Sequence, residues 1–295
     1  MITEGAVKII DHLDEFERYL SLSTKAQIEE KLPLFNELVF SQNAQFYSCI
    51  PGMLPDGIKA ALPVVEANFD QVKANQNEII TRFNNVLSKF RKSFPLFKLD
   101  FEVHLMISLG FFNGMALPRD GKCYLLLGMD SLSGLSENHL KGYITHELFH
   151  IYHYQRNPEV ARITEIAMRT MKMPDLWGLL FTEGLACHAV QRIFPEIPEV
   201  EILAWQPLLA QSKPVLPLLA TEARAVLTSD DPKDIAGFFY FPNPGKPDLP
   251  TGCGYYLGML VAGIMAEKYP IDVLLKMPDE VLIREIDFSL QQLQK

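Results

Sequence analysis

The feature that most constrains the fold of this chain is a pair of histidines in the stretch His146-Glu147-Leu148-Phe149-His150. On a helix, residues four apart lie one turn apart on nearly the same face, so both imidazoles can reach one ion if this segment is helical. Zinc binds neutral imidazole nitrogen at about 2.0–2.1 Å, and Glu147 is close enough to take a proton from a zinc-activated water. The motif therefore predicts a zinc-binding helix in which Glu147 is the general base.

The residues around the motif predict a helix over about 136–156 with two different faces. Ser133 or Ser136 is its candidate N-cap. One stripe of this helix is apolar and consists of Leu140, Ile144, Leu148 and Ile151, whereas the opposite stripe carries His139, His146, His150 and His153. This distribution is typical of a buried metal-site helix, and a surface helix with incidental histidines is the alternative.

A zinc site needs a third protein ligand, and the best candidate is Glu183. It belongs to a predicted helix over about 175–192, where it lies at helical spacing among Leu176, Leu179, Leu180, Ala186 and Val190. A carboxylate on a core-facing stripe is costly unless a cation compensates its charge. Zinc would do so, and an ion pair with Arg162 or Arg169 is the alternative.

His153 is a rival third ligand because it shares the histidine face. It lies seven residues from His146, which corresponds to about 10.5 Å of helical rise. That distance is too long for one tetrahedral ion, so we expect His153 to line the cleft or support a ligand rather than bind the metal. The pattern HExxHxxGxxH is also absent, since Arg156 occupies the position of its last histidine.

The motif His146–His150 followed by Thr182-Glu183-Gly184-Leu185-Ala186 resembles the gluzincin group of zinc metallopeptidases. The resemblance covers roughly residues 97–192 and implies a zincin-like core, with zinc held by His146, His150 and Glu183. Three features depart from it. Thr182 stands where the aminopeptidases have Asn, Cys187 stands where thermolysin-like enzymes carry an Asp that orients a ligand histidine, and the GxMEN strand of aminopeptidases is missing.

The resemblance also implies a Tyr or His that stabilises the oxyanion of the tetrahedral intermediate. Tyr255 and Tyr256 are the candidates, in a glycine-flanked stretch at the start of a predicted helix. His188 is another candidate, while His104, in a predicted strand, is more consistent with a structural role. In zincin-like folds an edge strand before the metal helix pairs with extended substrate, and residues 122–128 occupy that place in the sequence.

Periodicity predicts an α+β chain that is predominantly helical, with the zincin-like core packed on a small sheet. Residues 1–95 form a helical N-terminal region, beginning with Val7, Ile10, Leu13, Phe16 and Leu20 at helical spacing. The small sheet spans 97–128, with strands at 97–108 and 122–128 and turns at Asn113-Gly114 and Arg119-Asp120-Gly121. The metal helices span 136–192. Ten prolines between residues 195 and 250 predict short helices within a helical C-terminal part, 199–295.

The composition excludes several other classes of protein. A net charge of −9 disfavours nucleic acid and anionic membranes as partners, and the longest apolar run, residues 257–266, is too short to cross a bilayer. Acidic residues near the N-terminus disfavour a cleaved export signal, so a cytoplasmic location is expected. The four cysteines form no CxxC pair and are expected to be free bystanders.

These observations together predict a zinc metallopeptidase that hydrolyses a peptide or protein substrate. Two alternatives keep the same scaffold. The first is a zinc hydrolase of a non-peptide bond, and the second is a catalytically silent binding protein. An intact Glu147 argues against the second, because a binding module needs no base between two metal ligands.

Overall fold

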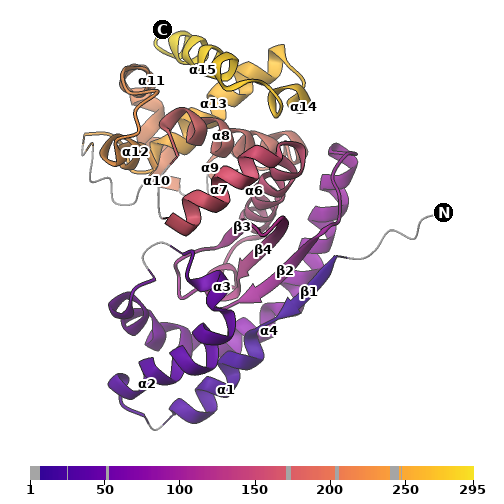
Figure 1. Ribbon diagram of the computed structural model, residues 1–295, viewed down its shortest axis with the longest axis vertical. Coiled ribbons are helices and arrows are strands. Elements are labelled where there is room, and N and C mark those ends of the chain that lie inside the picture. The colour runs from indigo at the N-terminus through magenta and orange to yellow at the C-terminus, as the bar shows by residue number, and fades with distance from the viewer. Residues whose placement is uncertain are drawn as a thin grey trace, which may run out of the picture.

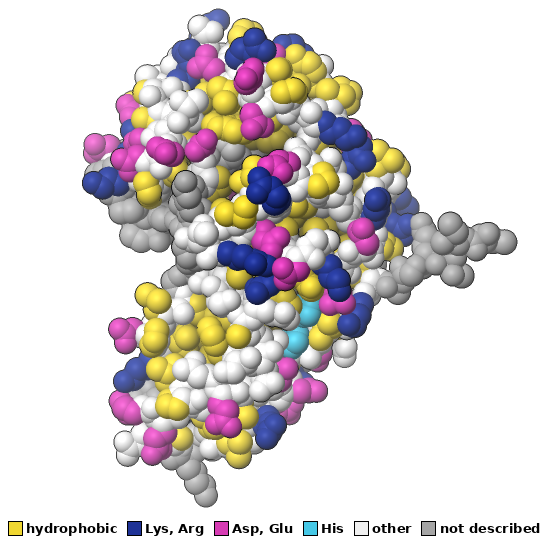
Figure 2. Space-filling view, in the orientation of Figure 1, with side chains coloured by type: hydrophobic (Ala, Val, Ile, Leu, Met, Phe, Trp, Pro, Cys, Tyr) yellow, Lys and Arg dark blue, Asp and Glu magenta, His cyan; other side chains and the backbone are white. Residues whose placement is uncertain are grey.

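The computed structural model describes residues 7–24, 26–50, 53–170, 174–202, 206–239, 246 and 248–295. Most of these residues are helical, and a four-stranded mixed sheet lies between the N-terminal helices and the helices that follow it (Figure 1). The prediction of an α+β, predominantly helical chain is therefore confirmed. On the face shown in Figure 2, acidic and basic side chains are interspersed.

The N-terminal part is helical except for its first element, β1 (Lys8–Asp11). Its helices are α1 (Leu13–Ser23), α2 (Ile28–Phe35), η1 (Asn36–Phe40), η2 (Ser41–Asn43), α3 (Ala44–Tyr47) and α4 (Pro55–Ser93). Helix α4 has 39 residues and contains Pro63. It buries an apolar stripe and packs against α5 (Met129–Leu132) and α6 (Glu137–Arg156), so it connects the N-terminal helices to the helix that carries the two motif histidines.

The sheet has the order β1-β2-β4-β3, with β2 at Phe101–Met106, β3 at Gly114–Arg119 and β4 at Lys122–Gly128. Strand β1 pairs with β2 in parallel, in the register Lys8↔Glu102. The prediction that residues 7–11 begin a helix was therefore wrong, because pairing with a distant strand overrides a weak local period. Since β1 and β2 share a sheet, the segments on either side of residue 95 are joined by strand pairing.

Strand β3 was also missed, because its first residue, Gly114, was predicted to lie in a turn. β3 and β4 form an antiparallel hairpin, and β2 pairs with β4 in parallel. Asp120 and Gly121 form the tight turn with φ of 50° and 75°, the positive values that a two-residue hairpin turn requires. Strand β4 therefore lies inside the sheet, and β3 is the edge strand next to α6. The predicted strand at 97–108 is confirmed only over β2.

The remaining helices are α5 (Met129–Leu132), α6 (Glu137–Arg156), α7 (Pro158–Thr170), α8 (Leu176–Ile193), α9 (Glu199–Ile202), α10 (Gln206–Ser212), η3 (Lys213–Val215), α11 (Leu216–Ala225), α12 (Pro232–Phe239), α13 (Cys253–Lys268), α14 (Ile271–Leu274) and α15 (Asp279–Leu293). Short helices occupy the described part of the proline-rich region, as predicted. None of the described helices has the length and apolar composition needed to cross a bilayer.

Helices α8 and α13 cross at two glycines. A Cβ atom added to Gly258 would lie 2.6 Å from the carbonyl oxygen of Leu180, and one added to Gly184 would overlap the carbonyl of Gly258. The absence of side chains at both positions lets the two backbones touch. This crossing brings Glu183, on α8, close to the first turn of α13.

Candidate metal centre

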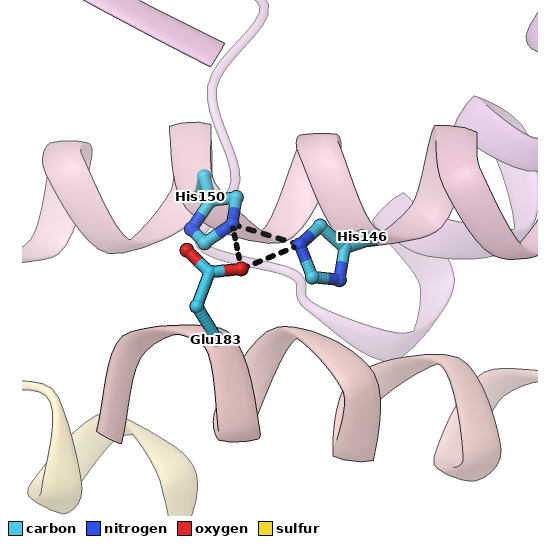
Figure 3. A group of neighbouring side chains, drawn as sticks. All are labelled: His146, His150 and Glu183. Carbon is cyan, nitrogen blue, oxygen red and sulfur yellow. Dashed lines mark hydrogen bonds and ion pairs between the residues drawn. The ribbon is translucent and has the colours of Figure 1, made fainter. Parts of the chain in front are cut away.

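The two histidines of the motif and Glu183 meet between α6 and α8 (Figure 3). The Nε2 atoms of His146 and His150 lie 3.0 Å apart. Glu183 Oε2 lies 3.1 Å from His146 Nε2 and 3.5 Å from His150 Nε2. Three ligand atoms from two helices therefore form a nearly equilateral triangle.

The size of this triangle fits a small tetrahedral metal ion. Two ligand atoms that each lie about 2.0–2.1 Å from a tetrahedral ion are about 3.3 Å from each other. The measured separations of 3.0, 3.1 and 3.5 Å span that value. The nitrogen and oxygen donors of these three residues could therefore hold a metal ion without rearrangement of α6 and α8.

The electrostatics of the triangle favour a cation. Burial would raise the pKa of Glu183, but the charge of His150 and hydrogen bonds from both histidines outweigh burial and lower it. Burial would lower the pKa of His150, and Glu183 reverses that effect and raises it. The alternative arginine partners bind other carboxylates, Arg162 pairing with Glu159 and Arg169 with Asp120. The carboxylate of Glu183 thus faces the two histidines.

Helix α6 begins as the sequence predicted. Ser136 is its N-cap, and its hydroxyl accepts a hydrogen bond from the backbone N–H of His139. The apolar stripe is buried, with Ile144 and Leu148 fully covered. Burial of this stripe fixes the rotation of the helix, so the motif histidines face α8.

Glu147 is oriented by the edge strand. Its Oε2 accepts a hydrogen bond from the backbone N–H of Ala116 in β3 at 2.7 Å. A Cβ atom on Gly114 would lie 2.6 Å from Glu147 Cγ, so glycine leaves the space that this side chain fills. One carboxylate oxygen is therefore held by the sheet, and Oε1 remains for another partner.

The hydrogen bond from Ala116 to Glu147 also changes the expectation that an extended substrate pairs with an edge strand at residues 122–128. The predicted edge, residues 122–128, is internal, so a strand adding to this side of the sheet would have to pair with β3. Ala116 already donates its N–H to Glu147, and Pro118 has no N–H to donate. Strand β3 can therefore offer an added peptide few backbone donors.

Cys187, which was expected to be a bystander, contacts a histidine of the triangle. All four cysteines are free thiols, but the sulfur of Cys187 lies 3.7 Å from Nδ1 of His146, one turn along α8 from Glu183. Its side chain is buried. Burial, reinforced by the charges of Glu183 and Glu147, raises the pKa of the Cys187 thiol.

The structure distinguishes the two candidate tyrosines. Burial raises the pKa of Tyr255 well above 10, and the charges of Glu183, Cys187 and Glu147 raise it further, which places its phenol in the field of the site. Burial also raises the pKa of Tyr256, but the charge that acts on it is Glu199 of α9. Of the two candidates, Tyr255 is therefore the one whose pKa responds to the charges of Glu183 and Glu147.

Two tyrosines of α6 near the site were missed by sequence reasoning. The ring of Tyr154 stacks on His150, with centroids 6.4 Å apart and planes 19° apart. Burial raises the pKa of Tyr154 and of Tyr143, and the charge of Glu147 contributes to both shifts. Helical spacing could have found them, because Tyr154 lies four residues after His150 and Tyr143 four before Glu147.

The other histidines lie outside the triangle. His153 is buried against Phe181, and neither of its ring nitrogens has a hydrogen-bond partner among the described residues. Burial and the charge of His150 lower its pKa to about 3. His139 bonds to Ser136 at the exposed start of α6, and His188 lies near Gly263. His104 bonds to His12 in the sheet region.

Comparison with known proteins identifies no relative of this chain. No protein-family model matches it, no curated protein matches it, and no solved structure matches it. The function must therefore be argued from the geometry of the site.

Proposed function

We propose that this protein is a zinc-dependent peptidase with a zincin-like core, similar to the gluzincins. His146, His150 and Glu183 would hold zinc. The observation that carries the proposal is the triangle of their ligand atoms, with sides of 3.0, 3.1 and 3.5 Å, next to the oriented carboxylate of Glu147. Two imidazoles and one carboxylate, with one position left for water, form the ligand set of catalytic rather than structural zinc sites.

Glu147 is the general base of this proposal. Zinc, when bound, supplies a Lewis acid that activates water and polarises the scissile carbonyl. Ala116 holds Oε2 of Glu147 by a hydrogen bond, so Oε1 is free to take the proton of the attacking water. The same carboxylate then carries this proton to the nitrogen of the leaving amine.

Tyr255 would donate a hydrogen bond to the developing oxyanion. Its raised pKa keeps the phenol protonated at neutral pH, so the hydroxyl is available as a donor. The first turn of α13 positions it, and the glycine crossing of α8 and α13 sets the distance between that turn and Glu183.

Metal binding is tested first, by measuring zinc content and thermal stability. Wild-type protein is expected to bind one zinc per chain and to gain about 2.7 kcal/mol of stability at a free zinc concentration one hundred times the Kd. His150→Ala should lose both effects. His139→Ala, on the same helix but outside the triangle, should keep them. Wild-type protein that takes up no stoichiometric zinc would refute the proposal.

Hydrolysis is tested with a peptide library and a matched pair of variants. Glu147→Gln should retain zinc and lose a factor of about 10² to 10⁴ in kcat, because it removes a general base. Glu159→Gln, an exposed carboxylate paired with Arg162, should be unaffected. Glu147-dependent turnover of esters or amides but of no peptide would identify a hydrolase of another bond. Zinc binding without any turnover would identify a binding protein.

A further inference from the structure

The ring of His146 has polar partners on both of its nitrogens. Nε2 lies in the triangle with His150 and Glu183, and Nδ1 lies 3.7 Å from the sulfur of Cys187. Cys187 is 2% exposed, so it lies in the interior of the site. The thiol is therefore the side-chain group that the structure places on the outer nitrogen of this ligand.

The protonation of Nδ1, the ring nitrogen that faces away from the triangle, determines whether Nε2 of a histidine can bind a metal. A neutral imidazole carries one proton, and Nε2 can offer a lone pair to an ion only if that proton lies on Nδ1. The proton on Nδ1 then needs an acceptor, because an unpaired buried N–H is costly. A thiol sulfur accepts a hydrogen bond weakly, and a contact of 3.7 Å is within the range of N–H···S bonds.

We propose that Cys187 is a positioning residue for the metal centre, whose sulfur accepts the Nδ1 proton of His146. This bond selects the tautomer with a free Nε2 and holds the ring in the orientation seen in Figure 3. The inference rests on the proposed zinc site and adds Cys187 as a residue that orients one of its ligands.

A thiol also suits the charge of this site. The carboxylates of Glu147 and Glu183 already lie beside the motif histidines, and both contribute negative charge to the surroundings of Tyr255. A thiol can accept from His146 without placing a third carboxylate in a buried region. Neutral sulfur is, however, a weaker acceptor than a carboxylate, so replacing it with a neutral oxygen acceptor should preserve or improve metal binding.

The contact could instead be ordinary packing between α6 and α8, and variants at position 187 separate the two explanations. Cys187→Ala removes the acceptor and leaves a small space. Cys187→Asn supplies a neutral carbonyl oxygen that can accept the same proton. The matched control is Cys49→Ala, which removes a buried thiol from the N-terminal helices, where it donates to the Gln45 carbonyl.

The measurements are zinc affinity, by competition with a chromogenic chelator, and the tautomer of His146, from ¹⁵N NMR of the zinc-loaded protein. Cys187→Ala should weaken zinc binding by about tenfold, the lower end of the range for outer partners of ligand histidines. Cys187→Asn should restore the wild-type Kd or a lower one, and Cys49→Ala should leave it unchanged. In the wild type, the NMR spectrum should show the proton on Nδ1 of His146.

Two outcomes would overturn the inference while leaving the zinc site intact. One is a Kd for Cys187→Ala within twofold of wild type, and the other is an equal loss in the Ala and Asn variants, which would indicate packing. If wild-type protein binds no zinc, the proposed function fails first and this inference fails with it. Measuring the wild type first therefore distinguishes the two failures.

Discussion

Acid is expected to destabilise this protein through His104, which belongs to a hydrogen-bonded series of side chains that does not include the motif. His104 Nδ1 lies 2.9 Å from His12 Nε2, and His12 Nδ1 lies 3.2 Å from Glu15 Oε1. The planes of the two rings are almost parallel, 10° apart. When neutral His12 donates Nδ1–H to Glu15, its Nε2 accepts the Nδ1–H of neutral His104.

Burial, followed by the charge of His12, lowers the pKa of His104 from 6.5 to about 4, although Glu102 partly opposes both effects. In the unfolded chain His104 binds a proton below about pH 6.5, whereas in the folded protein it stays neutral down to about pH 4. The unfolded state therefore binds more protons in this window, and stability falls as the pH decreases through it. With 1.36 kcal/mol for each tenfold change in proton affinity, the full loss is about 3 kcal/mol, most of which has occurred at pH 4.5.

The variant His104→Asn tests this value. Its side-chain amide can replace Nδ1–H as the donor to His12 and does not titrate. Urea denaturation followed by circular dichroism, with a chelator present to remove metal, gives the free energy of unfolding at pH 7.5 and 4.5. The decrease between these pH values should be about 2–3 kcal/mol smaller in His104→Asn than in wild type. His139→Asn, at a half-buried histidine in the first turn of α6, is the control.

Comparing each protein with itself at two pH values cancels any constant cost of the smaller asparagine side chain. Other buried histidines, including His153, contribute equally to wild type and variant, so their acid sensitivity also cancels. If the two proteins lose the same free energy between pH 7.5 and 4.5, or if the variant loses more, burial of His104 does not control its protonation and the reasoning is refuted.

Two further predictions concern the α8–α13 contact and the tyrosines near it. Gly184→Ala should destabilise the fold by about 1–3 kcal/mol, because the added Cβ overlaps the Gly258 carbonyl. In thermal denaturation the control Gly178→Ala, with open space around its Cβ, should be neutral or stabilising. Equal effects of the two variants on stability would show that the crossing is not tight. Tyr255→Phe should lower kcat/KM on a cleaved peptide about 10²- to 10³-fold, because it removes the proposed oxyanion donor. Tyr256→Phe should leave kcat/KM unchanged. Similar losses of kcat/KM in both variants would contradict the assignment of Tyr255 as the donor.

The parts of the site that could be predicted are those set by helical periodicity. The i, i+4 spacing of His146 and His150 defines a face of α6 within one turn, and the position of Glu183 on an apolar stripe marks it as needing a cation. Each of these signals depends only on residues within one helix, so it can be recognised without knowledge of the rest of the fold. The tertiary structure adds the distance between the two helices, and three ligand atoms do meet between them.

Strands β1 and β3 could not be predicted because their stabilising partners are far away or ambiguous in the sequence. Strand β1 has four residues, and its hydrogen bonds go to β2, after the whole N-terminal helical segment. In β3, Gly114 and Pro118 are residues that sheets usually disfavour, so the local preference indicated a turn. Pairing with β4 through a tight two-residue turn overrides that preference.

The residues that disfavour β3 as a strand are those that adapt it to the site. Gly114 leaves the space that the Glu147 side chain occupies, and Ala116, between Gly114 and Pro118, donates the hydrogen bond that orients the carboxylate. A strand of larger, more typical residues would pair as well with β4 but would push Glu147 away from the edge. The weak strand signal and the orientation of the proposed base therefore have one cause, which is the close approach of α6 to the edge of the sheet.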